Sequence, residues 1–113
     1  MLIFNLKKQW YEKILRGEKT IEYRKVKSYW TTRLWHNGCL PERHKPYEFE
    51  EVKKNIAGIV FAPECVLTLG YTKRKMFATI VKVEYLRTGK DTDLAIDAPV
   101  YAIHLDNVRE VTE

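Results

Sequence analysis

ILRGEKTIEYR, residues 14–24, changes its hydrophobic period at a glycine. Ahead of Gly17, apolar residues recur at helical spacing and share one face of a short helix over residues 8–16: Trp10, Tyr11, Ile14 and Leu15. From Lys19 to Lys25 the residues alternate in polarity instead, which is typical of a half-buried strand with Thr20, Glu22 and Arg24 on its polar face. Gly17 fits the position after a helix end, where a positive φ is needed. The segment therefore predicts a helix, a glycine stop and a strand.

Further elements are predicted on both sides of this segment. A second short helix is expected to start at Ser28, as its N-cap, and to run to Leu34, because apolar residues recur there at helical spacing. The clearest strand is Met76 to Leu86, in which Phe77, Thr79, Val81, Val83 and Tyr85 share one face. The remaining strands are expected over residues 2–6, 57–62 with a continuation at 66–69, and 100–105.

Five to six strands with two short helices near the N-terminus predict an α+β fold whose sheet curls into a small β-barrel. An open mixed sheet is the alternative, because periodicity alone does not choose between the two. The 113 residues are expected to form a single domain, residues 1–113. Residues 35–55 contain Gly38, Pro41 and Pro46 among alternating charges, which indicates an inserted irregular loop.

Basic residues are concentrated near the N-terminus. Residues 1–35 carry nine Lys or Arg and three Glu, whereas the rest of the chain carries eleven basic and twelve acidic residues. Such a distribution favours a polyanionic partner, because neutralising phosphates releases counterions. A solvated basic surface without a partner explains the same charges, and the charge distribution alone does not separate these readings.

Cysteine and apolar patterns exclude several classes of protein. Cys39 and Cys65 form no CxxC pair, so we expect two thiols in a reducing, cytoplasmic location rather than a disulfide scaffold. The spacing of His36, Cys39 and His44 does not match a zinc site, and we expect neither a metal nor another cofactor. No stretch approaches the ~20 apolar residues of a membrane span, so no membrane partner is expected.

The segment from Ile14 to Arg24 resembles the ASCH family, in which a helix ends in Gly and is followed by Lys and then, along a strand, by Glu and Arg. The resemblance is specific over residues 2–34, moderate over 57–105 and absent from 35–55. Gly70-Tyr71 before the long strand and residues 101–105 as the closing strand also fit the family. The resemblance implies a PUA-like β-barrel with a cleft beside the motif, in a superfamily rich in RNA-binding domains.

Candidate site residues follow from this resemblance and from side-chain chemistry. Lys19 could meet a phosphate or a base carbonyl or act as a general base, Glu22 could accept from an exocyclic amine, and Arg24 could clamp an anion. Five more ligand-binding candidates combine aromatic and basic side chains: Tyr29, Arg33 and Trp35, with Lys73 and Arg74 at a predicted hairpin tip. Structural roles are expected for three others, namely Tyr23 and Trp30 in the core and His104 as a hydrogen-bonded barrel residue.

Three functions compete at this stage. The first is an RNA- or nucleoside-binding domain that uses a basic cleft around residues 17–24. The second is a hydrolase of the ribonuclease or acylcytidine amidohydrolase type, with Lys19 and Glu22 catalytic. The amidohydrolase branch has its Thr nucleophile three residues beyond the Lys, where this chain has Glu22. Thr20 is adjacent to Lys19 and is expected to point to the strand face opposite Lys19, so the motif supplies no Lys-activated Thr nucleophile. The third is a protein-interaction domain that uses the 35–55 loop.

Overall fold

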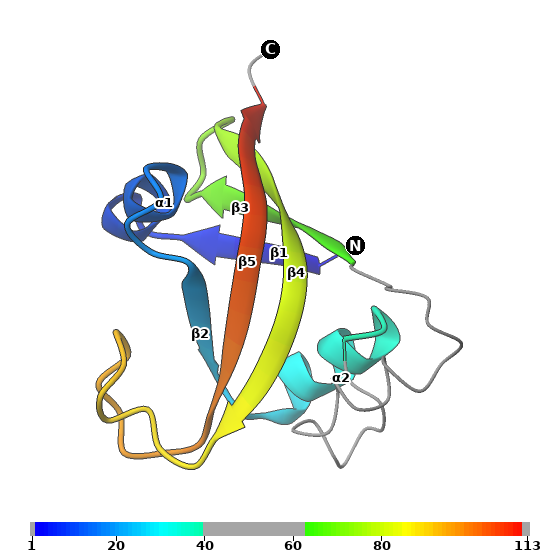
Figure 1. Cartoon of the computed structure of the whole chain (residues 1–113), viewed down its shortest axis with the longest axis vertical. Helices are drawn as coiled ribbons and strands as arrows, with labels where there is room; N and C mark the ends of the chain where they lie inside the picture. The colour runs from blue at the N-terminus through cyan, green and yellow to red at the C-terminus, as the bar shows by residue number, and fades with distance from the viewer. Residues whose placement is uncertain (1, 40–62, 112–113) are drawn as a thin grey trace.

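The computed structural model describes residues 2–39 and 63–111, and their strands form one five-stranded mixed sheet (Figure 1). The strand order is β1-β3-β4-β5-β2, so the first two strands of the chain form the two edges of the sheet. The elements run, in chain order, β1 Leu2–Leu6, α1 Lys8–Leu15, β2 Ile21–Lys25, α2 Ser28–His36, β3 Glu64–Leu69, β4 Lys75–Leu86 and β5 Val100–Val111.

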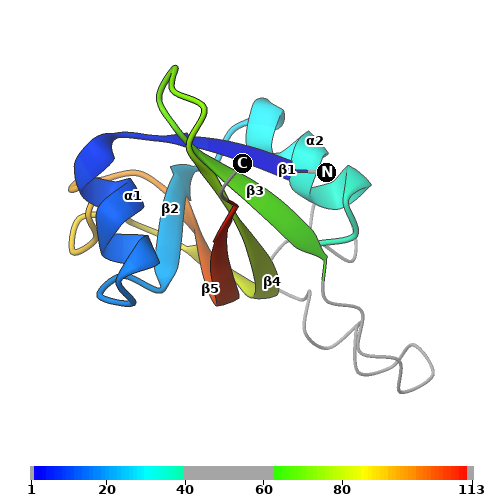
Figure 2. The ribbon, with the colours of Figure 1, turned by 90° about the horizontal axis from the view of Figure 1, so that it is seen from above.

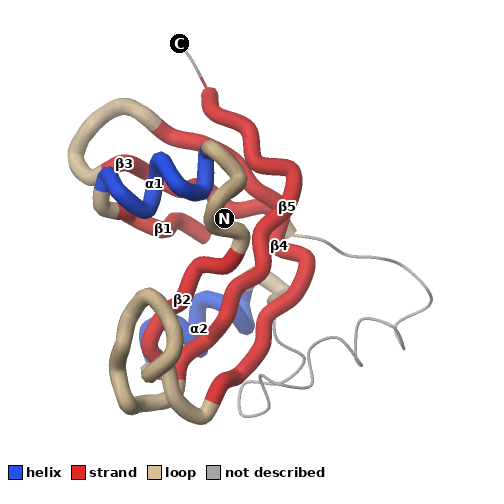
Figure 3. The backbone as a smooth tube through the Cα atoms, turned by 60° about the vertical axis from the view of Figure 1, so that its left-hand side comes forward, coloured by secondary structure: helices blue, strands red, loops and turns tan. Residues whose placement is uncertain are grey.

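Strand irregularities bend the sheet into a half-barrel. β1 pairs with β3 in parallel, and all other neighbours are antiparallel. The register between β4 and β5 shifts twice, between Phe77 and Thr79 and between Ile80 and Lys82, and Asn107 opposite the first shift has a φ of +51°. Because such bulges bend and twist a strand, the long β4–β5 pair curves along its length (Figures 1 and 3). The curled α+β sheet predicted from the sequence is confirmed at this level.

The core fills the concave side of the half-barrel. Phe4 of β1 stacks on Trp30 of α2 with ring centroids 5.2 Å apart. Tyr11 and Ile14 of α1 are buried, and α1 and α2 lie at opposite ends of β1 (Figure 2). Glu22 is the one charged residue buried among the described residues, with 6% of its surface exposed. The core therefore admits a carboxylate on β2.

The helix stop at Gly17 is confirmed. α1 ends at Leu15 with Arg16 as its C-cap, and Gly17 follows with a φ of +79°. The Gly17 N–H donates to Ile14 O at 3.1 Å and the Glu18 N–H donates to Lys13 O at 2.9 Å. This pair of bonds is a Schellman motif, which satisfies carbonyls left over at a helix end. The chain is thereby turned from α1 into β2.

Several boundaries differ from the sequence-based expectations. Lys27, not Ser28, is the N-cap of α2, and no side chain caps this helix, because Ser28 is already helical. α2 continues to His36, so Trp35 belongs to a helix and not to the 35–55 loop. β2 begins only at Ile21, β3 begins at Glu64, and β5 extends to Val111. The expected strand at 57–62 and the loop residues 40–55 lie outside the described residues, as does most of the surface invoked for the protein-interaction hypothesis.

The single face expected for the long strand is also wrong. Met76, Ala78 and Ile80 are buried in its first half, whereas Val83 is buried in its second half. The register shift between Ile80 and Lys82 inserts one residue, and an insertion of one residue exchanges the two faces of a strand. In the described residues, neither α1 nor α2 has the length and apolar character needed to cross a membrane.

Replacement of Gly17 tests the turn into β2. A Cβ at this position would meet no atom within 4 Å, so the cost of Gly17→Ala comes from the positive φ alone. We expect a loss of about 1 kcal/mol in the free energy of unfolding, measured by urea denaturation. Gly17→Asn is the control and should lose less, because Asn tolerates this conformation better. Equal stability of Gly17→Ala and the unsubstituted protein would contradict the role assigned to the glycine.

Candidate ligand-binding cleft

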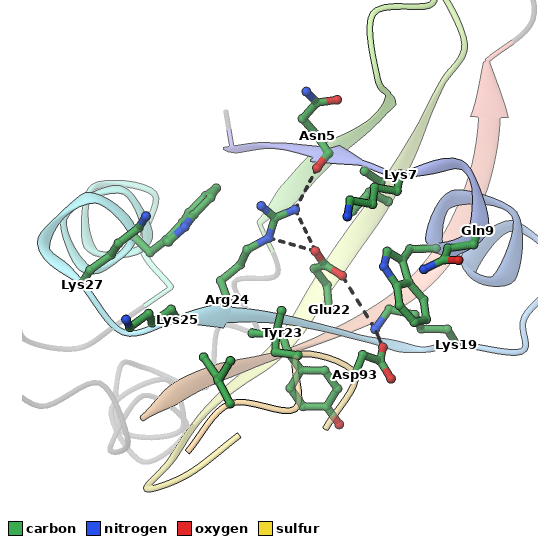
Figure 4. A pocket seen from close by; sticks show the side chains of 15 residues that line it. Asn5, Lys7, Gln9, Lys19, Glu22, Tyr23, Arg24, Lys25, Lys27 and Asp93 are labelled. Atoms are coloured by element: carbon green, nitrogen blue, oxygen red, sulfur yellow. Dashed lines mark hydrogen bonds and ion pairs between the residues drawn. The ribbon is translucent and has the colours of Figure 1, made fainter. Parts of the chain in front are cut away.

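A cleft of about 530 Å³ opens between the two edge strands of the half-barrel (Figure 4). Its wall is formed by the end of β1, the start of α1, β2, the start of α2 and the loop between β4 and β5. Basic side chains outnumber acidic ones in this wall: Lys7, Lys19, Arg24, Lys25 and Lys27 face Glu22 and Asp93. The three residues singled out in the sequence motif, Lys19, Glu22 and Arg24, thus line one hollow.

Arg24 joins the two sheet edges across this cleft. Its Nε donates to Glu22 Oε2 at 2.8 Å, and its Nη2 lies 2.7 Å from the same oxygen. Nη2 also donates to the backbone oxygen of Asn5 on β1 at 3.1 Å. Because β1 and β2 are not neighbours in the sheet, this guanidinium supplies a link between them where backbone pairing is absent.

Aromatic rings enclose the Arg24 guanidinium. Its Cζ lies 5.3 Å from the centroid of Phe4 and 5.0 Å from the centroid of Trp30, within the range of cation–π attraction. Only 21% of the Arg24 side-chain surface and 8% of the Glu22 side-chain surface are exposed. The pair therefore has the geometry of a desolvated, hydrogen-bonded ion pair rather than a surface contact.

Lys19 makes more contacts than its place in the sequence motif predicts. Its ammonium lies 3.7 Å from Glu22 Oε1, contacts the Asp93 carboxylate, and stands 5.4 Å and 5.0 Å from the ring centroids of Trp10 and Tyr23. Its side chain is 9% exposed. Lys19, Glu22, Arg24 and Asp93, hereafter the central cluster, carry two positive and two negative charges.

Burial shifts the titration of Glu22 in the central cluster. Desolvation raises the pKa of the Glu22 carboxyl above its usual range, and the nearby charges of Arg24 and Lys19 lower it by less. Asp93 raises the Glu22 pKa further. Burial also raises the pKa of Tyr23, with contributions from Asp93 and Glu84. A buried carboxyl with a raised pKa can hold and release a proton closer to neutral pH than an exposed one.

The net positive charge of the cleft comes from its rim. Lys7, Lys25 and Lys27 are exposed, and none of them forms an ion pair with another residue in the described parts of the chain. Lys27 lies 5.9 Å from the centroid of the Tyr29 ring. The rim lysines, Lys7, Lys25 and Lys27, thus surround a central cluster that is neutral overall.

The aromatic and basic candidates on α2 do not line the cleft. Tyr29 is 50% exposed, and the Arg33 guanidinium lies 3.5 Å from its ring centroid. Trp35 is 39% exposed and contacts the ring of His36. Trp30 is buried, as predicted. Tyr23, expected in the core, is half-buried and lines the cleft instead.

Lys73 and Arg74 lie in the turn between β3 and β4, as predicted, but outside the cleft. Arg74 Nη2 donates to Glu110 Oε2 at 2.8 Å, and its Cζ lies 5.2 Å from the Tyr11 ring centroid. Arg74 thus serves an ion pair that ties the turn to β5. His104 is half-buried and lies 2.5 Å from Glu84 Oε1, which agrees with the expected hydrogen-bonded role.

Sequence reasoning missed several residues of the cleft wall. Asp93 contacts Lys19 although 74 positions separate them, and it comes from a segment expected only to be a polar connection. Trp10 was assigned to the apolar face of the helix, yet its ring is half-buried and lines the cleft. No local signal marks Asp93, because only the return of β5 beside β2 brings the two segments together.

Within residues 2–39 and 63–111 no group of three or more His, Cys, Asp or Glu side chains could hold a metal ion. His44, whose spacing from His36 and Cys39 was compared above with that of a zinc site, lies outside the described residues. Cys39 and Cys65 are both buried, and burial raises the pKa of the Cys65 thiol to about 12. A thiol held protonated in this way is a poor nucleophile, so Cys65 is a core residue.

Comparison with known proteins adds no relative. No family model matches the chain, and neither a curated protein nor a solved structure was found to be similar to it. The functional argument therefore depends on the geometry of the cleft.

The raised pKa of Glu22 gives a pH-dependent prediction. The folded protein takes up a proton at Glu22 more readily than the unfolded chain, so falling pH through the folded-state pKa should stabilise the protein relative to Glu22→Gln. The measurement is the difference in free energy of unfolding between the two proteins, from urea denaturation at a series of pH values. Glu18→Gln, which changes an exposed carboxylate outside the cluster, is the matched control. A free energy of unfolding of the unsubstituted protein that decreases relative to that of Glu22→Gln as pH falls would contradict the burial of the Glu22 charge.

Proposed function

We propose that the cleft between β1 and β2 binds RNA or a nucleoside. One observation carries the proposal: a single hollow combines a donor–acceptor pair, the buried Glu22 and the half-buried Arg24, with aromatic rings and a rim of three lysines. A base needs hydrogen-bonding groups and a stacking surface, whereas its phosphates need cations. The cleft offers these two environments next to each other.

The volume of the cleft and its available hydrogen-bonding groups support a ligand of this kind. A volume of about 530 Å³ falls within the range of small-molecule sites, roughly 300–1,000 Å³. The contacts of Arg24 with other described residues use Nε and Nη2, which leaves Nη1 to donate to a base or a phosphate. Glu22 can accept from an exocyclic amine, and the rings of Trp10 and Tyr23 can stack on a base.

Membership of the ASCH family and a PUA-like half-barrel are part of the proposal. Three features support it: α1 ends at Gly17, the next strand carries Glu22 and Arg24, and the cleft lies beside this segment. These are the features that the resemblance implies. Asp93 adds a carboxylate from the β4–β5 loop to the motif residues.

Salt-dependent binding of single-stranded RNA tests the role of the rim. Lys25→Ala/Lys27→Ala removes two rim cations, and we expect weaker binding and a slope of log K against log salt that is smaller by about 1.4. Fluorescence anisotropy with a labelled mixed-sequence oligonucleotide across a salt series measures both quantities. Arg87→Ala/Lys90→Ala, which removes two exposed cations of the β4–β5 loop that do not line the cleft, is the matched control and should leave the slope unchanged. The same slope for both variants would place RNA elsewhere.

A hydrolase acting on RNA or a modified nucleoside is the second candidate, and the raised pKa of Glu22 beside Lys19 favours it. Glu22 would transfer the proton, Lys19 would stabilise charge and Arg24 would hold an anion. Thr20 is exposed and does not line the cleft, so water is the nucleophile in this candidate. Activation of water by a carboxylate needs no covalent intermediate.

Turnover separates the two candidates. The purified protein is incubated with single-stranded RNA and with N4-acetylcytidine, and products are followed by chromatography. The binding function predicts intact substrates. The hydrolase candidate predicts turnover that falls about 100-fold or more in Glu22→Gln, because general acid–base catalysis contributes about 10²–10⁴-fold. Turnover that persists in Glu22→Gln but disappears in Glu18→Gln would contradict both assignments.

A further inference from the structure

A second groove of about 380 Å³ adjoins the cleft at the end of β1. Its wall contains Asn5, Leu6 and Lys7, which the cleft shares, together with Lys8 and residues of the β3–β4 turn. The two hollows therefore lie on either side of the same three residues. A ligand longer than one nucleotide could pass from one to the other over Lys7.

The turn beside this groove is held in place by backbone and side-chain hydrogen bonds. β1 runs parallel to β3, so their ends coincide, and the Gly70 N–H donates to Leu6 O at 3.1 Å. Thr72 Oγ1 donates to Leu69 O at 2.7 Å and accepts from the Arg74 N–H at 3.2 Å. Gly70 takes a φ of +51°, which turns the chain directly after β3. The groove wall is thus fixed relative to the cleft.

Charge and exposure in this region suit a polyanion with a planar base. Lys7 and Lys8 line the groove, and no acidic residue of the described chain does. Lys8 approaches Glu12 only at 4.0 Å, with 77% of its side chain exposed, so this contact is weak. Tyr71, between two residues of the groove wall, is fully exposed. An exposed aromatic ring on the turn that forms the groove wall can serve as a stacking platform for a base.

We infer that the groove is a second subsite, so the ligand is a single strand of several nucleotides and not a free nucleoside. One base occupies the cleft, Lys7 binds the phosphate that crosses the end of β1, and Lys8 with Tyr71 holds the following nucleotide. This inference rests on the proposed function of the cleft. It narrows the ligand from nucleosides and RNA to single-stranded oligonucleotides.

The test compares ligand length with the position of the substitution. Isothermal titration with cytidine 5′-monophosphate and with a mixed-sequence RNA octanucleotide is carried out on the full chain. We expect Lys8→Ala/Tyr71→Ala to weaken octanucleotide binding about tenfold or more, given stacking worth ~1–3 kcal/mol per base, and to leave mononucleotide binding unchanged. Tyr71→Phe keeps the ring and should bind the octanucleotide like the unsubstituted protein. Lys25→Ala/Lys27→Ala should weaken the binding of both the mononucleotide and the octanucleotide.

Failure of the second subsite and failure of the cleft give different results. If Lys8→Ala/Tyr71→Ala binds the octanucleotide as tightly as the unsubstituted protein while the rim variant is weakened, the second subsite is wrong and the cleft stands. If the rim variant also binds both ligands normally, both proposals fall. Binding to phosphatidylserine vesicles that depends on Lys8 and Tyr71, without octanucleotide binding, would overturn the inference in favour of a membrane surface.

Discussion

The ion pair between Glu22 and Arg24 is the interaction on which the site depends. A carboxylate buried on the concave face of a sheet is costly unless it is paired and hydrogen-bonded, and Arg24 supplies both functions through Nε and Nη2. The same guanidinium reaches the Asn5 carbonyl on the opposite edge. Between the edge strands β1 and β2, this side-chain contact thus takes the place of backbone hydrogen bonds. The cleft lies between these two strands because no continuous row of backbone hydrogen bonds joins them.

Charge is divided between the floor and the rim of the cleft. The central cluster is neutral overall, and its members Lys19, Glu22 and Arg24 are largely desolvated, so their contribution to recognition would come from the direction of hydrogen bonds. The rim lysines are solvated, and their contribution would be long-range and sensitive to salt. All three rim lysines come from the basic N-terminal third of the chain. The charge imbalance visible in the sequence is therefore concentrated around one hollow, although two basic side chains are neutralised within it.

A second polar cluster, formed by Tyr11, Arg74 and Glu110, helps to hold α1 in place. The Tyr11 hydroxyl donates to Glu110 Oε2 at 2.9 Å, and Arg74 binds the same oxygen, so α1, β5 and the β3–β4 turn meet at one carboxylate. The hydrogen bond from Tyr11 holds the pKa of Glu110 below its usual range, and burial raises the pKa of Tyr11. Since α1 carries Trp10 and leads through Gly17 to Lys19, this cluster helps to determine where the cleft wall lies. The same cluster gives Arg74 a structural role, because its guanidinium pairs with Glu110 of β5.

Local sequence determined the helix, its stop and the strand that follows, but not how the elements come together in the sheet. The period change at Gly17 and the alternation of β2 are properties of neighbouring residues, so the helix, its stop and the placement of Glu22 and Arg24 on one strand face could be predicted. The bulges in β4 and β5 exchange strand faces through an extra residue that alternation does not reveal. Asp93 and Asn5 join the site only because the order β1-β3-β4-β5-β2 brings the edges and the β4–β5 loop together. Contacts between residues far apart in the chain decide which charges are paired, and for that reason only the tertiary structure distinguished the neutral floor from the positive rim.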